Sequence, residues 1–430
     1  MKKRILFIMQ KNFLHPITKE CRYNTGNLVF ITSGMSMFYD KDIDSKFIPK
    51  NEVINNLVKD KNWAKNNFDI AITMEANIFS CDNNETLLNE AKLIKMLKIP
   101  TFILGAGCQS DINFSLDFLK IISENAKQYI DTIRNSGGEV TLRGEFSKYA
   151  LETLGYNDLF VSGCPSLFLK ADSFNISNFK TSRKDFKPAL NGYQVSCINS
   201  KIYDTYKNSE FFDQDMYLKS LYEPDSVKDI YDKKFNAPFQ ELYTSNRIKG
   251  ALNYYVWDKQ IKEGNFSFSY GSRIHGNIIA LQNEIPSFVK VIDSRTRELV
   301  EFYKIPNSIE IPFNEEKDDL YDLYTMVNYD NFNHNIKIKR ENFKQFLEKY
   351  DIPNCLDNNK GYIKHLSTLK YIELNNNVYS NRKNLLRKLE QKKNINMIIK
   401  NKLKKVFYKI IYKFTQKDIY YKKYQKYKHR

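Results

Sequence analysis

The stretch TFILGAGCQSDINFSLDFLKIISENAKQYIDTIRNSGGEVTLRGEFSKYALETLG, residues 101–155, alternates short apolar runs with longer segments of helical spacing. Residues 101–104 and 139–142 are predicted strands, and residues 116–133 and 145–154 are predicted helices. Strand and helix in alternation indicate parallel strands joined by crossover helices. The stretch therefore predicts a doubly wound α/β sheet, whose ligands bind where strands end and helices begin.

The same alternation extends in both directions from this stretch. Further strands are predicted at 4–9, 69–73, 159–161, 192–199, 265–270 and 287–292, and further helices at 85–97 and 274–282. A polar stretch at 173–186 reads as a linker, and residues 200–245 give no clear pattern. We expect two doubly wound, Rossmann-like domains that face a cleft, at 1–180 and 187–328. Closing helices at 329–380 and a basic tail at 381–430 would follow them.

The charge of the chain is distributed unevenly. The composition is 42% hydrophobic and 14% aromatic, which argues against general disorder. The formal net charge of +17 taken alone suggests a nucleic-acid-binding protein. The distribution of this charge along the chain indicates otherwise. Residues 381–430 hold 18 Lys and Arg against Glu390 and Asp418, whereas residues 1–380 hold 49 basic and 48 acidic residues. The body is therefore nearly neutral, and the basic charge belongs to the tail.

The tail has the pattern of a basic amphipathic helix, typical of segments that lie on anionic membranes. Its apolar side consists of Ile399, Leu403, Val406, Phe407, Ile410, Ile411 and Phe414. Packing on the body, a solvated tail, and base stacking by the Tyr-rich residues 420–430 are the alternatives. The apolar run at 5–9 is shorter than the roughly 7–15 residues of a signal peptide. No run reaches the roughly 18 apolar residues of a membrane-spanning helix. We expect a cytoplasmic protein, peripheral on the inner face of a membrane if the tail binds lipid.

The six cysteines are scattered without a CxxC spacing, so they read as reduced thiols. No cluster of His, Asp and Glu with metal-ligand spacing is visible, and we expect neither a metal site nor a cofactor. Cys164 follows the strand at 159–161, but no His lies near it in the sequence. A structural thiol is therefore favoured over a nucleophile.

The segment Ser272-Arg273-Ile274-His275-Gly276 carries the most chemical information. It follows the aromatic strand at 265–270, and apolar residues after it indicate a helix. Arg273 and His275 thus stand at a helix N-terminus, where free N–H groups and the dipole favour an anion. Arginine grips phosphate or carboxylate with two N–H groups, and histidine exchanges protons near neutral pH. A structural histidine is the alternative for His275.

Other strand ends carry weaker signals. Asp293 and Arg295 follow a strand, either as an ion pair that caps the next helix or as substrate contacts. Arg143 stands at a strand-to-helix junction aimed at the expected cleft, and taken alone it reads as a surface ion pair. Gly105, Gly107 and Gln109 follow the strand at 101–104, where glycines let the backbone approach a ligand.

Taken together and in order, these elements resemble the polysaccharide pyruvyltransferase family. The resemblance spans roughly residues 20–310. Its matching pieces are 24–28 with Asn24 and Asn27, 105–109, 141–147, 163–166, 273–276, 280–281, 285–286 and 293–299. Many members carry Asp where Cys164 stands, so a catalytic role for this thiol is not expected. Residues 200–245 and the tail match nothing in the family.

The resemblance implies a fold like that of the two-domain GT-B glycosyltransferases, with phosphoenolpyruvate as the donor substrate. The family transfers pyruvate to saccharides as a ketal. In this chain it implies that Arg143, Arg273 and His275, with Ser272 and Gly276, hold or activate the donor. Asn24, Asn27, Gly105, Gly107, Gln109, Asp293 and Arg295 are the further expected cleft contacts. The acceptor would be a saccharide of cell-surface polysaccharide biosynthesis, lipid-linked if the tail binds membrane.

Two other functions remain open from the sequence. A GT-B sugar-nucleotide glycosyltransferase would use the same cleft for a diphosphate. A non-enzymatic nucleic-acid binder would act through the tail. The neutral body makes this second alternative the weakest, and we expect no nucleic-acid partner.

Overall fold

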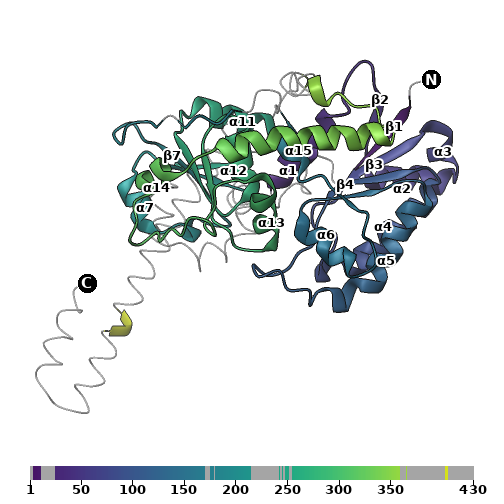
Figure 1. The fold of residues 1–430 in the computed structure, drawn as a ribbon, viewed down its shortest axis with the longest axis horizontal. Helices are drawn as coiled ribbons and strands as arrows, with labels where there is room; N and C mark the ends of the chain where they lie inside the picture. Colours follow the sequence, from purple (N-terminus) through teal and green to yellow (C-terminus); the bar gives the residue numbers. More distant parts are fainter. Residues whose placement is uncertain are drawn as a thin grey trace, which may run out of the picture. The chain divides into compact units, whose positions relative to one another are not determined.

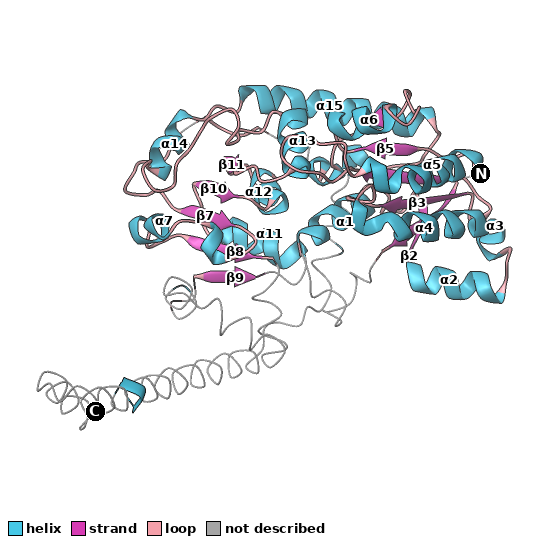
Figure 2. Ribbon diagram, turned by 90° about the horizontal axis from the view of Figure 1, so that it is seen from below, coloured by secondary structure: helices cyan, strands magenta, loops and turns pink. Residues whose placement is uncertain are grey.

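The chain folds into two parallel β-sheets, each packed against helices (Figures 1 and 2). The computed structural model describes residues 3–10, 25–169, 175–178, 180–214, 242, 245, 247–250, 254–358, 365 and 402–404. Both sheets belong to one unit, Met1–Leu218 with Ile230–Tyr371. The second unit, Lys219–Asp229 with Ile372–Arg430, lies outside the described residues apart from 402–404. The predicted amphipathic helix of the tail falls there and stays a prediction.

The first sheet has six strands in the order β2-β1-β3-β4-β5-β6, and every neighbouring pair is parallel. The strand order reverses between β1 and β3, which opens a crevice at their carboxyl ends. The strands are β1 Arg4–Met9, β2 Asp44–Pro49, β3 Ile70–Met74, β4 Thr101–Ala106, β5 Val140–Leu142 and β6 Phe160–Val161.

Helices cover both faces of the first sheet. They are α1 Gly26–Ser36, α2 Lys50–Lys59, α3 Trp63–Asn67, α4 Asn84–Leu97, α5 Leu119–Asn135 and α6 Glu145–Glu152. On one face, apolar residues of α2 to α6 form the core with Leu6, Ile103 and Val140 of the strands. On the other face, α1 packs so closely that a side chain added at Gly34 would collide with Met74.

The second sheet has five parallel strands in the order β11-β10-β7-β8-β9, with its reversal between β7 and β10. Its strands are β7 Pro188–Asn191, β8 Glu210–Asp213, β9 Ile248–Gly250, β10 Phe268–Gly271 and β11 Ser287–Val289. Its helices are α7 Ser200–Thr205, α11 Tyr254–Glu263, α12 Ile274–Leu281, α13 Ser294–Tyr303 and α14 Leu320–Met326. Two doubly wound α/β domains are thereby confirmed.

One predicted strand is wrong. Residues 192–199 contain a 3₁₀ turn at Val195–Cys197, and the strand of this region is β7, just upstream. Only Val195 and Ile198 of the apolar residues there are fully buried, and their spacing of three suits a helical turn. Pro188 opens β7 at its first position, where a proline does not interrupt the hydrogen-bond ladder.

One long helix, α15 Asp330–Lys349, reaches from the edge strand β11 of the second sheet to the edge strand β6 of the first (Figures 1 and 2). At its amino end, the Tyr329 hydroxyl donates to the carbonyl of Ser287 in β11, at 3.0 Å. Towards its carboxyl end, Phe346 stacks on Phe160 of β6 with ring centroids 5.0 Å apart. The expected closing helices are thus this helix and a short 3₁₀ turn at Leu356–Asn358, within the part of 329–380 that the structure describes. Within the described residues, every helix is too short or too polar to cross a bilayer.

Candidate active site

Side chains from both domains surround one cavity of about 60 Å³. Three arginines line it, so we call it the arginine cavity. Arg143 follows β5 of the first domain, Arg273 follows β10 of the second, and Arg295 lies in the first turn of α13. Ser272, His275, Asp293 and Asn27 also line it. The structure therefore brings together residues that lie up to 268 positions apart in the sequence.

A buried asparagine fixes the start of α12. The Asn191 side chain, at the end of β7, accepts a hydrogen bond from the backbone N–H of Arg273 at 2.9 Å. Its amide also donates to Asn277 at 3.1 Å. A Cβ at Gly276 would lie 2.9 Å from this side chain, so Gly276 permits close packing and does not line the cavity. The contact sets the first turn of α12, in which the backbone N–H groups of Gly276 and Asn277 donate to the Arg273 carbonyl. The N–H groups of Ile274 and His275 come before the first intrahelical hydrogen bond.

His275 lies half-buried beside these arginines. Burial lowers its pKa from 6.5 to about 3, aided by the positive charges of Arg143, Arg273 and Arg295. The imidazole is therefore neutral near pH 7. The three guanidinium groups that line the cavity bring positive charge to it, which favours an anionic ligand.

Arg143 is not the surface ion pair that its local sequence suggests. The side chain is 5% exposed, and its Nε lies 3.8 Å from Oε1 of Glu298, a buried residue of α13. Glu298 in turn accepts hydrogen bonds from the backbone N–H and the hydroxyl of Ser147. The Arg143 Nε has no hydrogen-bond partner among the described residues. This buried pair joins the two domains directly behind the cavity.

Two glycines of the first domain leave room for this pair. A Cβ at Gly107 would lie 2.7 Å from the Nε of Arg143, and one at Gly144 would lie 2.8 Å from the Glu298 carboxylate.

Gly105 has a left-handed φ of 69°. The predicted cleft contacts Gly105, Gly107 and Gln109 do not line the arginine cavity. Asn24 lies outside the described residues.

Asp293 caps α13 and pairs with Arg295, and both residues line the cavity. The Asp293 carboxylate accepts a hydrogen bond from the backbone N–H of Thr296 at 2.9 Å and caps α13. The Nε of Arg295 donates to the same carboxylate at 2.9 Å. Both side chains face the cavity, so the capping ion pair and the cleft contact, alternatives from the sequence, occur together.

Cys164 has a histidine partner that its sequence neighbourhood does not reveal. Its Sγ lies 3.9 Å from Nε2 of His275 and 2.7 Å from the hydroxyl of Ser166. Burial raises the pKa of this thiol. A thiol that stays protonated at neutral pH is a poor nucleophile, which agrees with the structural role expected for it.

A family model described as polysaccharide pyruvyl transferase matches residues 19–294, more than half of the chain. The chain belongs to the polysaccharide pyruvyl transferase family. The match begins after β1 and covers the rest of the first domain and the second domain through β11 to the first residue of α13. It includes every residue of the arginine cavity discussed above except Arg295 and Thr296.

Two solved structures of other proteins are among those similar to this pyruvyl transferase family member. Anabaena Alr3699/HepE in complex with UDP and glucose is 13% identical, with 85% of this chain and 100% of that chain covered and a TM-score of 0.39. Methanocaldococcus jannaschii UDP-GlcNAc 2-epimerase in complex with UDP-GlcNAc and UDP is 12% identical, with 80% and 100% covered and a TM-score of 0.43. No curated protein sequence matches the chain.

Proposed function

We propose that this transferase takes phosphoenolpyruvate as donor and moves its pyruvyl group onto two hydroxyls of a saccharide. The convergence of Arg143, Arg273 and Arg295 on one small cavity carries the proposal. Phosphoenolpyruvate has two anionic groups, a phosphate and a carboxylate. Guanidinium groups bind both kinds of anion with paired N–H donors. The N-terminus of α12 adds backbone N–H groups and the positive end of the helix dipole.

The reaction gives one ketal and one hydrogen phosphate from phosphoenolpyruvate and a diol. The first hydroxyl oxygen bonds to C2 while C3 gains a proton, so that the C2=C3 double bond becomes a single bond to a methyl group. Phosphate leaves C2 with the bonding electron pair, through an oxocarbenium-like state. The second hydroxyl oxygen then bonds to C2 and closes the ring, and its proton departs with the phosphate.

In this scheme, Arg273 and Arg143 bind the donor anions and His275 handles the proton. The imidazole is neutral in the free protein because of its low pKa. The donor's negative charges offset the arginines, so His275 gains a proton when phosphoenolpyruvate binds and delivers it to C3. Positioned proton transfer of this kind contributes roughly 10²- to 10⁴-fold in rate.

Donor binding tests the proposal first. Phosphoenolpyruvate should raise the thermal unfolding temperature of the wild-type full chain, and Arg273→Ala should abolish most of this shift. Arg183→Ala is the matched control, because Arg183 is a half-exposed arginine of the second domain that pairs with Asp319 outside the cavity. Stabilisation by UDP-sugars and none by phosphoenolpyruvate would favour a sugar-nucleotide glycosyltransferase instead.

Turnover tests the reaction itself. Purified protein, phosphoenolpyruvate and a panel of galactosides, glucosides and N-acetylmannosaminides, free and lipid-linked, should release phosphate and yield a product heavier by one pyruvyl ketal. Loss of the ketal product in Arg273→Ala, with Arg183→Ala unaffected, would support the donor site. Ketal formation that survives Arg273→Ala would contradict it.

A further inference from the structure

A second cavity, of about 230 Å³, opens at the carboxyl ends of β1 and β3. This is the point where the strand order of the first sheet reverses, the usual ligand position in such sheets. Two glutamates, Glu75 and Glu90, line it, so we call it the carboxylate cavity. Asn27, Ala76 and Asn77 line both this cavity and the arginine cavity, so the two spaces are neighbours.

Glu75 directly follows β3 and is 7% exposed. Its carboxylate accepts hydrogen bonds from the Gln10 amide at 2.8 Å and the Tyr129 hydroxyl at 2.9 Å. Both partners are neutral, and the nearby Lys50 is hydrogen-bonded to Glu90. Burial raises the pKa of Glu75 to about 7, although Tyr129, Lys50 and Gln10 each lower it. A buried carboxyl group with such a pKa can exchange a proton near neutral pH.

The other walls of the carboxylate cavity suit a polyhydroxylated ligand. Asn83 and Thr86 contribute an amide and a hydroxyl, and Phe30 contributes an aromatic surface. The Oδ1 atom of Asn77 is buried and accepts no hydrogen bond from the described residues. Asn77 lines both cavities and therefore stands at the boundary between them. A saccharide offers both hydroxyl donors and apolar C–H faces to such a lining.

We infer that the carboxylate cavity holds the acceptor saccharide, and that Glu75 takes the proton from the hydroxyl that attacks the donor. The inference rests on the proposed function, since it needs a donor in the arginine cavity. The shared wall of Asn27, Ala76 and Asn77 places an acceptor hydroxyl next to that donor. The charged and titratable groups near Glu75 are Lys50, Glu90 and Tyr129.

The protons of the reaction balance with this assignment. As the first acceptor oxygen bonds to C2, its proton passes to the Glu75 carboxylate, while C3 receives the proton of His275. The second hydroxyl loses its proton to the departing phosphate. Glu75 then releases its proton to solvent, and His275 regains one with the next donor. The net change is one ketal and one hydrogen phosphate per cycle.

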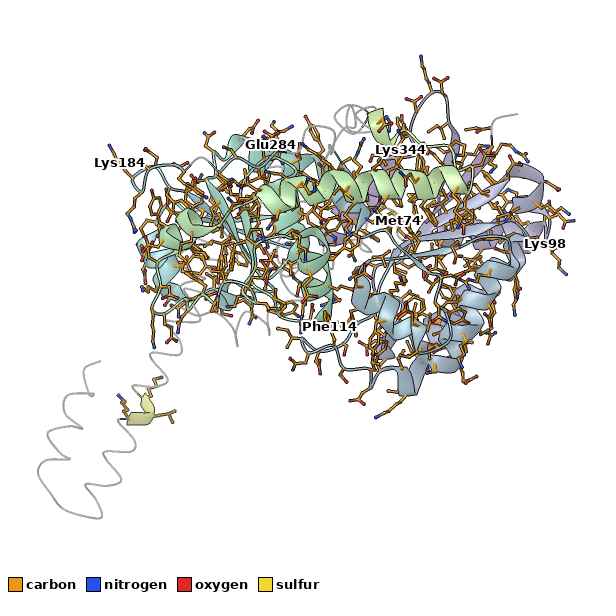
Figure 3. The ribbon with its side chains drawn as sticks, viewed as in Figure 1. Met74, Lys98, Phe114, Lys184, Glu284 and Lys344 are labelled. Carbon is orange, nitrogen blue, oxygen red and sulfur yellow. The ribbon has the colours of Figure 1, made fainter. Side chains whose placement is uncertain are left out.

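Saccharide binding can be tested without any turnover. Met74, labelled in Figure 3, ends β3 and lines the carboxylate cavity, so its methyl group is a local probe. In the full chain with ¹³C-methyl methionine, Met74→Leu assigns the signal. Methyl galactoside, methyl glucoside or N-acetylmannosamine at high concentration should shift this signal, with or without phosphoenolpyruvate. A Met74 signal that none of the three sugars moves would overturn the acceptor assignment.

Catalysis is tested with Glu75→Gln against Glu85→Gln. Glu85 is exposed on α4, the helix that also supplies Thr86 and Glu90, and serves as the matched control. Glu75→Gln should leave the dissociation constants of phosphoenolpyruvate and of the sugar within about threefold and lower kcat by roughly 100-fold or more. The rise of kcat with pH through about 7 should disappear in this variant.

The outcomes separate the inference from the proposed function. Sugar binding at Met74 without phosphoenolpyruvate binding would leave the saccharide site in place and refute the donor. Normal kcat and an unchanged pH profile in Glu75→Gln would refute Glu75 as the base, even where phosphoenolpyruvate binds and the ketal forms.

Discussion

Binding of phosphoenolpyruvate should raise the pKa of His275. In the free protein this pKa is about 3, against an ordinary value of 6.5. At 1.36 kcal/mol per pKa unit, protonating His275 costs about 5 kcal/mol more than protonating a histidine in water. The causes are burial and the three arginines of the cavity, and an anionic ligand acts directly on the latter.

The ligand's charges are large enough to reverse this effect. One unit charge at roughly 5 Å, in an effective dielectric of about 20, contributes about 3 kcal/mol. Phosphoenolpyruvate carries at least two negative charges, which together offset the cost of protonation. We therefore expect the bound complex to take up a proton, and His275 to titrate between about pH 5 and 8.

The measurement is a pH titration of the full chain with ¹³Cε1-histidine, in which the variant His275→Gln assigns the signal. The chain has only five histidines, so the spectrum is simple. In the free protein, the His275 shift should stay constant between about pH 5 and 8, and saturating phosphoenolpyruvate should make it titrate. A signal that titrates near 6.5 without ligand would refute the lowered pKa and, with it, the combined effect of burial and the arginines. A signal that stays constant with bound ligand would refute the proton-transfer role.

Three further predictions concern stability and the tail. The folded protein holds the Glu298 proton up to about pH 7, whereas the unfolded chain loses it near 4.5, so this group's contribution to stability falls as pH rises through that window. Glu298→Gln should therefore flatten the pH dependence of urea unfolding by up to about 3 kcal/mol; an unchanged slope would contradict the raised pKa. Gly163→Ala should destabilise the fold by about 2–4 kcal/mol, because the new Cβ would lie 2.1 Å from the Tyr303 hydroxyl at a φ of 77°. Gly155→Ala, at a φ of 104° but with open space around it, should cost about 1 kcal/mol in the same urea unfolding assay; equal losses would exclude the collision. Deleting residues 381–430 should lower binding to anionic liposomes while turnover of soluble saccharides persists; equal liposome binding would refute a membrane role.

The sequence predicts the alternation of the first domain well from β3 to β5, because these strands are largely apolar runs and the helices α4, α5 and α6 that follow them are amphipathic. It misses α1, whose residues are buried on nearly all sides. A helix without a polar face has no 3.6-residue periodicity to detect. The strands β8 and β9 are short, with four and three residues; β8 lies within the unclear segment at 200–245 and β9 lies just after it.

The candidate site was predictable where a side chain sits at a strand-to-helix junction. Arg143, Arg273, His275, Asp293 and Arg295 all lie at such positions. Contacts between distant segments leave no local signal, so the pairing of Arg143 with Glu298 and of Cys164 with His275 required the structure. Asn191 ends β7, and Glu75 directly follows β3. A systematic reading of polar residues after every strand would have found Glu75, which follows a predicted strand, but not Asn191, whose strand was misplaced.

The path of α15 has a mechanical consequence. A helix of this length spans about 30 Å. Its N-cap residue Tyr329 is hydrogen-bonded to β11, and Phe346 near its other end stacks on Phe160 of β6. It therefore acts as a strut between the two sheets. Pulling handles can be attached at Lys98 and Lys184, two exposed residues, one in each domain, that Figure 3 labels. Force applied between these handles would act on α15 before it acts on either sheet. Single-molecule pulling should then record one large rupture in which both domains yield together, in place of two separate steps.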